Sequence, residues 1–122
     1  MACKGTVLVV DDDPHLVAFL MAALEEEGCQ VLSAVDGAAL QLAHERPPDL
    51  ILLDIMMPIM DGVEVSCRLR ADPVTAQIPI IIMSARHRLA VLGPRLSVND
   101  QLAKPFDLTA LYTTVARWMP AA

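Results

Sequence analysis

Short, mostly apolar runs alternate along the chain with longer segments whose apolar residues recur at helical spacing. We interpret as β-strands the runs at residues 6–10, 29–34, 50–53, 79–83 and 101–104. The segments between them carry helix boundaries, such as Asp13-Pro14 before the first helix and Gly28 after it. This alternation predicts a doubly wound α/β domain, in which five parallel strands form a sheet with helices on both faces.

The run at residues 50–53 is apolar at every position and lacks the alternation of a strand with one solvent-exposed face. That pattern favours a central strand covered on both faces. Asp54 ends the run, so its carboxylate is expected at the edge of the sheet where open α/β folds bind their ligands. The alternative is a carboxylate that merely ends the strand.

The helix expected between residues 86 and 99 has Gly93-Pro94 near its middle. Proline lacks the amide hydrogen of a helical residue and clashes with the preceding turn. We therefore expect this fourth helix to be short or irregular.

The composition indicates one globular domain, 1–122, with a core built mainly from aliphatic side chains. Of its 122 residues, 55% are hydrophobic and only 3% are aromatic. The net charge of −6 would repel a phosphate backbone, which argues against nucleic acid as a partner. No apolar run approaches the length of a membrane-spanning helix, so no membrane partner is expected.

The cysteines give no sign of covalent or metal cross-links. Cys3, Cys29 and Cys67 are odd in number and contain no C-x-x-C pair, so we expect neither a disulfide framework nor a zinc site. A reducing, cytoplasmic compartment fits this pattern. The segment MACKGTVLVVDDD is too acidic, and its apolar run too short, for a signal peptide.

Polar side chains that suit phosphate chemistry follow several of the predicted strands. Because the carboxyl ends of parallel strands share one edge of a sheet, these residues are expected to lie together: Asp11, Asp12, Asp13, Asp54, Ser84, Ala85 and Lys104. Each alone is commonly a cap or a solvated surface residue. Their joint appearance at strand ends favours a binding or reaction site.

Neighbouring carboxylates repel one another unless a cation lies between them. Magnesium fits best, because it prefers oxygen ligands, takes one or two carboxylates and retains water that a phosphoryl oxygen can replace. With the charge shielded, a carboxylate such as Asp54 can attack phosphorus as a nucleophile and form an acyl phosphate. Lys104 and Ser84 would bind the phosphoryl oxygens as negative charge develops on them.

Four short segments are spread over most of the chain. In order, they are VLVVDDDP, LILLDIMMPIMDG, IIIMSA and LAKPF. Together they resemble the receiver domain of two-component response regulators, which has a flavodoxin-like fold. The resemblance implies a phospho-accepting signalling switch that catalyses only its own phosphorylation and dephosphorylation, not an enzyme with separate substrates. It also implies that the phosphoryl group comes from a phosphohistidine on a sensor histidine kinase or a histidine phosphotransfer protein.

Carried over to this sequence, the resemblance makes Asp54 the phosphoacceptor. Asp12 and Asp54 would bind magnesium directly, and Met56 would contribute its backbone carbonyl. Asp11 would act on the metal through a bound water.

The resemblance also implies roles around the phosphoryl group. Lys104 would pair with a phosphoryl oxygen, and the Lys104-Pro105 peptide bond is expected to be cis. The Ser84 hydroxyl and the Ala85 amide would bond to the phosphoryl group and register its presence.

Several positions depart from the family pattern or vary within it. Gln101 stands where an aromatic residue is usual, so a switch based on an aromatic rotamer is not expected. Met56 and Arg86 fill the two variable positions beside the site and could alter the lifetime of the phosphorylated form. The segment around Gly93-Pro94 is unusual too, so the downstream effector is not specified and a homodimer remains one open alternative.

Two other functions are compatible with an acidic edge. One is a receiver-like module that binds partners without phosphate, although the residues expected to handle phosphate are all present: Asp12, Asp54, Ser84 and Lys104. The other is a small-molecule phosphatase with an aspartyl nucleophile. Such enzymes need a second Asp two residues after the nucleophile, where this chain has Met56.

Overall fold

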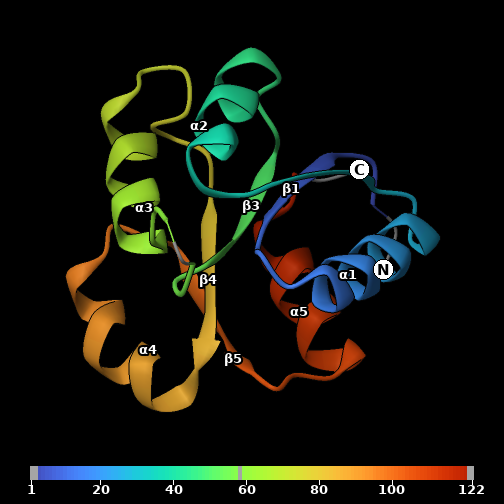
Figure 1. The fold of residues 1–122 in the computed structure, drawn as a ribbon. Coiled ribbons are helices and arrows are strands. Elements are labelled where there is room, and N and C mark those ends of the chain that lie inside the picture. The colour runs from blue at the N-terminus through green and yellow to red at the C-terminus, as the bar shows by residue number, and fades with distance from the viewer. Residues whose placement is uncertain (1–2, 58, 121–122) are drawn as a thin grey trace.

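The computed structural model describes residues 3–57 and 59–120, and its strands and helices alternate as predicted (Figure 1). The strands are β1 (Thr6–Val10), β2 (Gln30–Ala34), β3 (Leu50–Asp54), β4 (Ile80–Ala85) and β5 (Asp100–Lys104). The helices are α1 (Pro14–Glu26), α2 (Asp36–Glu45), α3 (Gly62–Ala71), α4 (Arg86–Leu92) and α5 (Leu108–Trp118), and a 3-10 turn (Gly93–Arg95) follows α4.

All the neighbouring strands of the sheet are parallel, and their order is β2-β1-β3-β4-β5. This order is that of the flavodoxin-like doubly wound fold, so the predicted fold class is confirmed. β3 is the central strand, and every one of its residues is buried, as its uninterrupted apolar run predicts. Its carboxyl end, at Asp54, therefore opens at the middle of the sheet edge.

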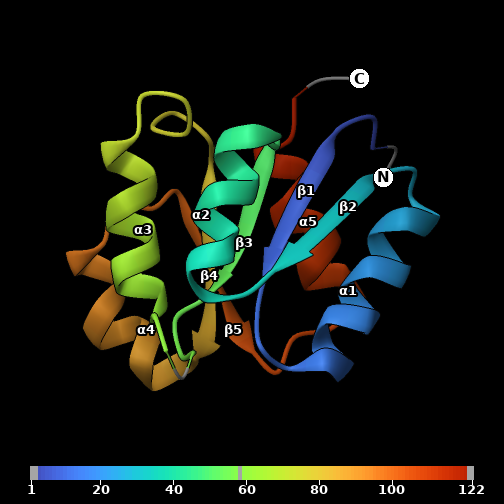
Figure 2. The same ribbon diagram turned by 45° about the horizontal axis from the view of Figure 1, so that its top comes forward.

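Two hydrophobic cores lie on opposite faces of the sheet, because successive side chains of a strand point to opposite sides. One core packs Val7 and Val9 of β1 against α1 and α5. The other packs Leu8 and Val10 against α2, α3 and α4. Figure 1 and Figure 2 show the same division, with α1 and α5 on one side of the strands and the other three helices opposite.

The region between β4 and β5 is partly as predicted. The helix α4 is short and gives way to the 3-10 turn at Gly93–Arg95, as the Gly-Pro pair indicates. Strand β4, however, continues beyond its predicted end at residue 83, because Ser84 and Ala85 pair with Ala103 and Lys104 of β5. Ser84 is thus held within the ladder instead of following it.

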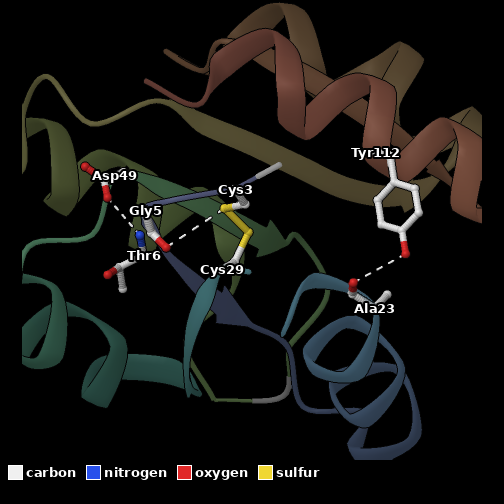
Figure 3. Close-up of a disulfide and its surroundings, with 7 residues drawn as sticks. All are labelled: Cys3, Gly5, Thr6, Ala23, Cys29, Asp49 and Tyr112. Atoms are coloured by element: carbon white, nitrogen blue, oxygen red, sulfur yellow. Dashed lines mark hydrogen bonds between the residues drawn. A yellow bond between two sulfur atoms is a disulfide. The ribbon is translucent and has the colours of Figure 1, made fainter. Parts of the chain in front are cut away.

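A disulfide joins Cys3 to Cys29, so the expectation that the chain has none is wrong (Figure 3). The Cys3 amide donates a hydrogen bond of 2.8 Å to the Glu27 carbonyl, which brings the chain before β1 to the turn before β2. The two Cα atoms lie 4.9 Å apart. The number and spacing of cysteines cannot show that the starts of two strands are neighbours. Cys67 is free and exposed.

None of the helices in the described ranges is both long enough and apolar enough to cross a membrane.

Candidate functional site

The carboxylates predicted at the strand ends do come together. Val10 of β1 pairs with Leu53 of β3. The residues that follow them, Asp11 and Asp54, therefore lie side by side. Both are buried, with 3% and 4% of their surface exposed, whereas Asp12 faces solvent. One carboxylate oxygen from each of these three residues lies within 4.8 Å of the other two, which is a donor set suited to a hard cation.

Lys104 reaches the same carboxylates from the end of β5. Its Nζ lies 3.0 Å from Asp11 Oδ2 and 3.4 Å from Asp54 Oδ1. Strand pairing places Lys104 there, because Ala85 at the end of β4 is its partner in the ladder. The Lys104-Pro105 peptide bond is cis, as predicted.

The electrostatics of this cluster are not balanced. Burial raises the pKa of the Asp54 carboxyl above its ordinary value, and the Asp11 carboxylate raises it further. The Lys104 ammonium opposes this shift but does not cancel it. Burial also lowers the pKa of Lys104, but its contacts with Asp11 and Asp54 outweigh that effect and leave the pKa raised. One ammonium thus faces more negative charge than it neutralises.

A cavity of about 300 Å³ opens beside the cluster. Its walls are formed by Asp11, Asp12, Asp13, Asp54, Met56, Ser84, Ala85, Arg88 and Lys104. Ser84 is only 3% exposed, yet its hydroxyl makes no hydrogen bond with any residue in the described ranges. That hydroxyl is therefore available to a ligand in the cavity. Asp13 instead caps α1, as predicted, by accepting hydrogen bonds from the first helical amides.

The loop after β3 is held in place by hydrogen bonds on both sides. The Met56 amide donates to Asp54 Oδ1 at 3.2 Å. The Gly62 amide donates to the Ile55 carbonyl at 2.8 Å, and a Cβ on Gly62 would collide with the backbone of β3. Only glycine therefore allows α3 to begin this close to the strand end.

Asp36 is a residue of this region that the sequence did not single out. It adopts a positive φ of 51°, which is unusual for a residue other than glycine. Its carboxylate accepts a hydrogen bond of 3.1 Å from the Met60 amide and so ties the start of α2 to the loop after β3. Sequence patterns do not indicate this contact, because a contact between segments far apart in the chain leaves no local pattern.

Two arginines of α4 lie in different surroundings. Arg86, predicted to stand beside the site, lines a separate cavity with Gln101, Ala103 and Pro105. Arg88, which the sequence did not single out, lines the acidic cavity.

Gln101 packs closely on Gly93, where a Cβ would collide with the Gln101 side-chain amide.

The family model of the response regulator receiver domain matches residues 7–116. The chain belongs to the response regulator receiver domain family. As a receiver domain, it is a phospho-accepting signalling switch of two-component systems. The fold, with its acids at the ends of β1 and β3, agrees with this membership.

Relatives of this receiver domain include proteins of very different lengths. The transcriptional regulatory protein PrrA of Mycobacterium tuberculosis is 45% identical over 112 residues, which cover 89% of this chain and 47% of PrrA. Protein PilH of Pseudomonas aeruginosa is 38% identical over 112 residues, which cover 89% of this chain and 93% of PilH. The chain thus spans about half the length of PrrA and most of the length of PilH.

A solved structure with the same fold is the receiver domain of the sensor histidine kinase PA1611 from Pseudomonas aeruginosa PAO1. It superposes with a TM-score of 0.86 at 29% identity and covers 95% of this chain and 98% of its own. That structure has a magnesium ion coordinated in its active site cleft.

Proposed function

We propose that Asp54 is the phosphoacceptor of this receiver domain and that magnesium is the cofactor of the transfer. The observation that carries the proposal is the position of Asp54. Its buried carboxylate ends the central strand, faces the cavity and contacts Lys104 at 3.4 Å. Burial and the neighbouring Asp11 carboxylate raise the pKa of Asp54, so a nearby cation would favour its charged form.

Magnesium fits the donor set of the cavity. Asp12 and Asp54 would bind it directly, Met56 would add its backbone carbonyl, and Asp11 would act through water. When bound, the metal would neutralise the carboxylates and bind phosphoryl oxygens. The mutual approach of the three acids within 4.8 Å supports this assignment.

The transfer is a displacement at phosphorus. An oxygen of Asp54 attacks the phosphorus of a phosphohistidine, the new P–O bond replaces the P–N bond, and the released imidazole takes up a proton. The Lys104 ammonium stabilises charge on one phosphoryl oxygen. Ser84 and Ala85 both line the cavity, which supports a role for the Ser84 hydroxyl and the Ala85 amide as hydrogen-bond donors to the attached group.

The partners follow from this chemistry. The donor would be a sensor histidine kinase or a histidine phosphotransfer protein, and the effector would be a protein that recognises the phosphorylated form. We place the receiver domain, residues 1–122, in the cytoplasm, where histidine kinases obtain ATP. Disulfides are uncommon there, so the redox state of Cys3 and Cys29 should be controlled in every experiment.

Intact-mass spectrometry after incubation with acetyl phosphate tests the proposal. We expect one phosphoryl group to be added when magnesium is present and none when it is chelated. Asp54→Asn should abolish the addition. Asp13→Asn is the matched control, because it removes a carboxylate from the same cavity while asparagine still caps α1. If no variant is labelled, even by a phosphohistidine donor, the chain is a phosphate-independent binding module.

A further inference from the structure

The acidic cavity has a second cation in its wall besides Lys104. Arg88, on the first turn of α4, lines the cavity together with Asp54. Its side chain is exposed, and its guanidinium makes no ion pair or hydrogen bond with the residues described by the structure. Lys104, in contrast, is already held by Asp11 and Asp54. Arg88 is therefore the cation of this wall that is free to bind something new.

Phosphorylation would increase the negative charge that this cavity contains. A phosphoryl group carries about −1.5 to −2 charges near neutral pH and presents three acceptor oxygens, whereas the free Asp54 carboxylate carries one charge. A guanidinium matches such oxygens with two parallel N–H donors, which a lysine ammonium cannot do. The phosphorylated cavity thus offers a partner of the chemistry that Arg88 recognises.

We propose that Arg88 binds the phosphoryl group attached to Asp54 and thereby couples α4 to the phosphorylation state. The proposal rests on the phosphoacceptor role of Asp54 set out above. It gives this receiver domain a link between the site and α4 that does not depend on an aromatic residue at position 101, where this chain has Gln101. Arg86 does not provide that link, because it faces the separate cavity beside Gln101.

The affinity for beryllofluoride tests this assignment, because beryllofluoride binds a carboxylate oxygen and imitates a phosphoryl group. Isothermal titration in the presence of magnesium should show that Arg88→Ala weakens binding about tenfold, the usual scale for a charge-assisted hydrogen bond. The affinity of Arg88→Lys should lie between those of Arg88→Ala and the unaltered chain. Arg86→Ala, which removes the same charge from the same helix, should bind like the unaltered chain. Added salt should reduce the effect of Arg88, because its side chain is exposed.

Hydrogen exchange supplies a second readout that a change in affinity alone would not move. At saturating beryllofluoride, the amides of α4 should become more protected in the unaltered chain and in Arg86→Ala, but not in Arg88→Ala. Circular dichroism and thermal melting would confirm that each variant is folded.

The outcomes separate this inference from the phosphoacceptor assignment. Binding by the unaltered chain that is lost in Asp54→Asn supports the assignment whatever Arg88 does. Equal affinity and equal protection in Arg88→Ala would overturn the role of Arg88 alone. Equal weakening in Arg86→Ala and Arg88→Ala would also overturn it, because the effect would then be one of general charge.

Discussion

At the amino-terminal edge of the sheet, the polar groups of the strand ends are paired within the protein, whereas at the carboxyl edge they face a cavity. Asp49 accepts a hydrogen bond from the Thr6 amide at 2.8 Å (Figure 3), and its own amide donates to the Thr6 carbonyl at the same distance. The disulfide between Cys3 and Cys29 joins the chain at this edge. The polar groups of Thr6 and Asp49 at the amino edge are thus satisfied by each other and do not need a ligand.

The carboxyl edge is organised in the opposite way. Asp11 and Asp54 are buried beside each other, and the Lys104 ammonium is the one cation among the described residues that contacts them both. Charges that are buried and incompletely paired reduce stability, so such an arrangement is characteristic of functional sites. One sheet thus keeps its stabilising contacts at one edge and its reactive groups at the other. A substitution at the amino edge should therefore change stability without changing phosphorylation, and a substitution at the carboxyl edge should change phosphorylation without removing the stabilising contacts of the amino edge.

The largest effect is expected for Lys104→Ala, which alters only the carboxyl edge. Loss of the ammonium that stabilises phosphoryl charge should slow labelling by acetyl phosphate about a hundredfold or more. Magnesium binding should persist or strengthen, because a positive charge near the carboxylates has gone. Time courses of intact mass and a magnesium titration followed by thermal melting would measure the two properties. Equal loss of both would contradict the phosphoryl role of Lys104.

Removal of the disulfide should affect only the amino edge. The bond closes a loop with a sequence separation of 26 residues, for which the chain-entropy model gives about 3.5 kcal/mol of stability. Cys3→Ser combined with Cys29→Ser should lower the denaturation midpoint in urea, while Cys67→Ser, at the free and exposed cysteine, should not. The rate of labelling below the melting temperature should be the same in all these variants. Slower phosphoryl labelling in the double variant alone would contradict the independence of the two edges.

Asp54→Asn should make the metal-free protein more stable at neutral pH, raising its melting temperature by a few degrees. The pKa of Asp54 is raised in the folded state, so this group stabilises the fold while protonated and loses that contribution as pH rises through the raised pKa. Asparagine imitates the protonated form, so the gain should disappear below the ordinary pKa of 3.8. Thermal melts across this pH range would show it. Magnesium should reverse the order at neutral pH, because only the unaltered chain gains a strong ligand.

The smallest effect is expected for Asp36→Ala, which removes the hydrogen bond to the Met60 amide. A single such bond contributes about 0.5–1.5 kcal/mol, so the loop after β3 should loosen and magnesium affinity should fall a few-fold. Asp36→Asn should restore most of the affinity, because asparagine keeps an acceptor oxygen and tolerates a positive φ. Isothermal titration with magnesium would compare the three proteins. An equal loss in both variants would show that the charge of Asp36, not its hydrogen bond, matters.

Much of the fold and of the acidic edge could be predicted, because both depend on local patterns. An uninterrupted apolar run indicates the central strand, and an acid directly after it must lie at the sheet edge, which places Asp54 correctly. The contacts that escaped prediction join segments far apart in the chain. Cys3 meets Cys29 only because the starts of β1 and β2 are neighbours, and Asp36 meets Met60 only because two loops converge.

Helix orientation is the other property that the sequence does not specify. Whether Arg86 or Arg88 faces the acidic cavity depends on how α4 is turned about its axis after β4. The strand also extends further than its apolar run, because pairing with β5 carries it through Ala85.

The most direct test of the functional edge is to locate the phosphoryl group within the chain. The acyl phosphate formed with acetyl phosphate and magnesium can be reduced with borohydride, which converts the acceptor aspartate to homoserine, and peptides can then be sequenced by mass spectrometry. We expect homoserine at position 54 and at no other position. Homoserine at position 11, 12 or 13 in place of position 54, or a labelled chain that yields none, would contradict the assignment of Asp54.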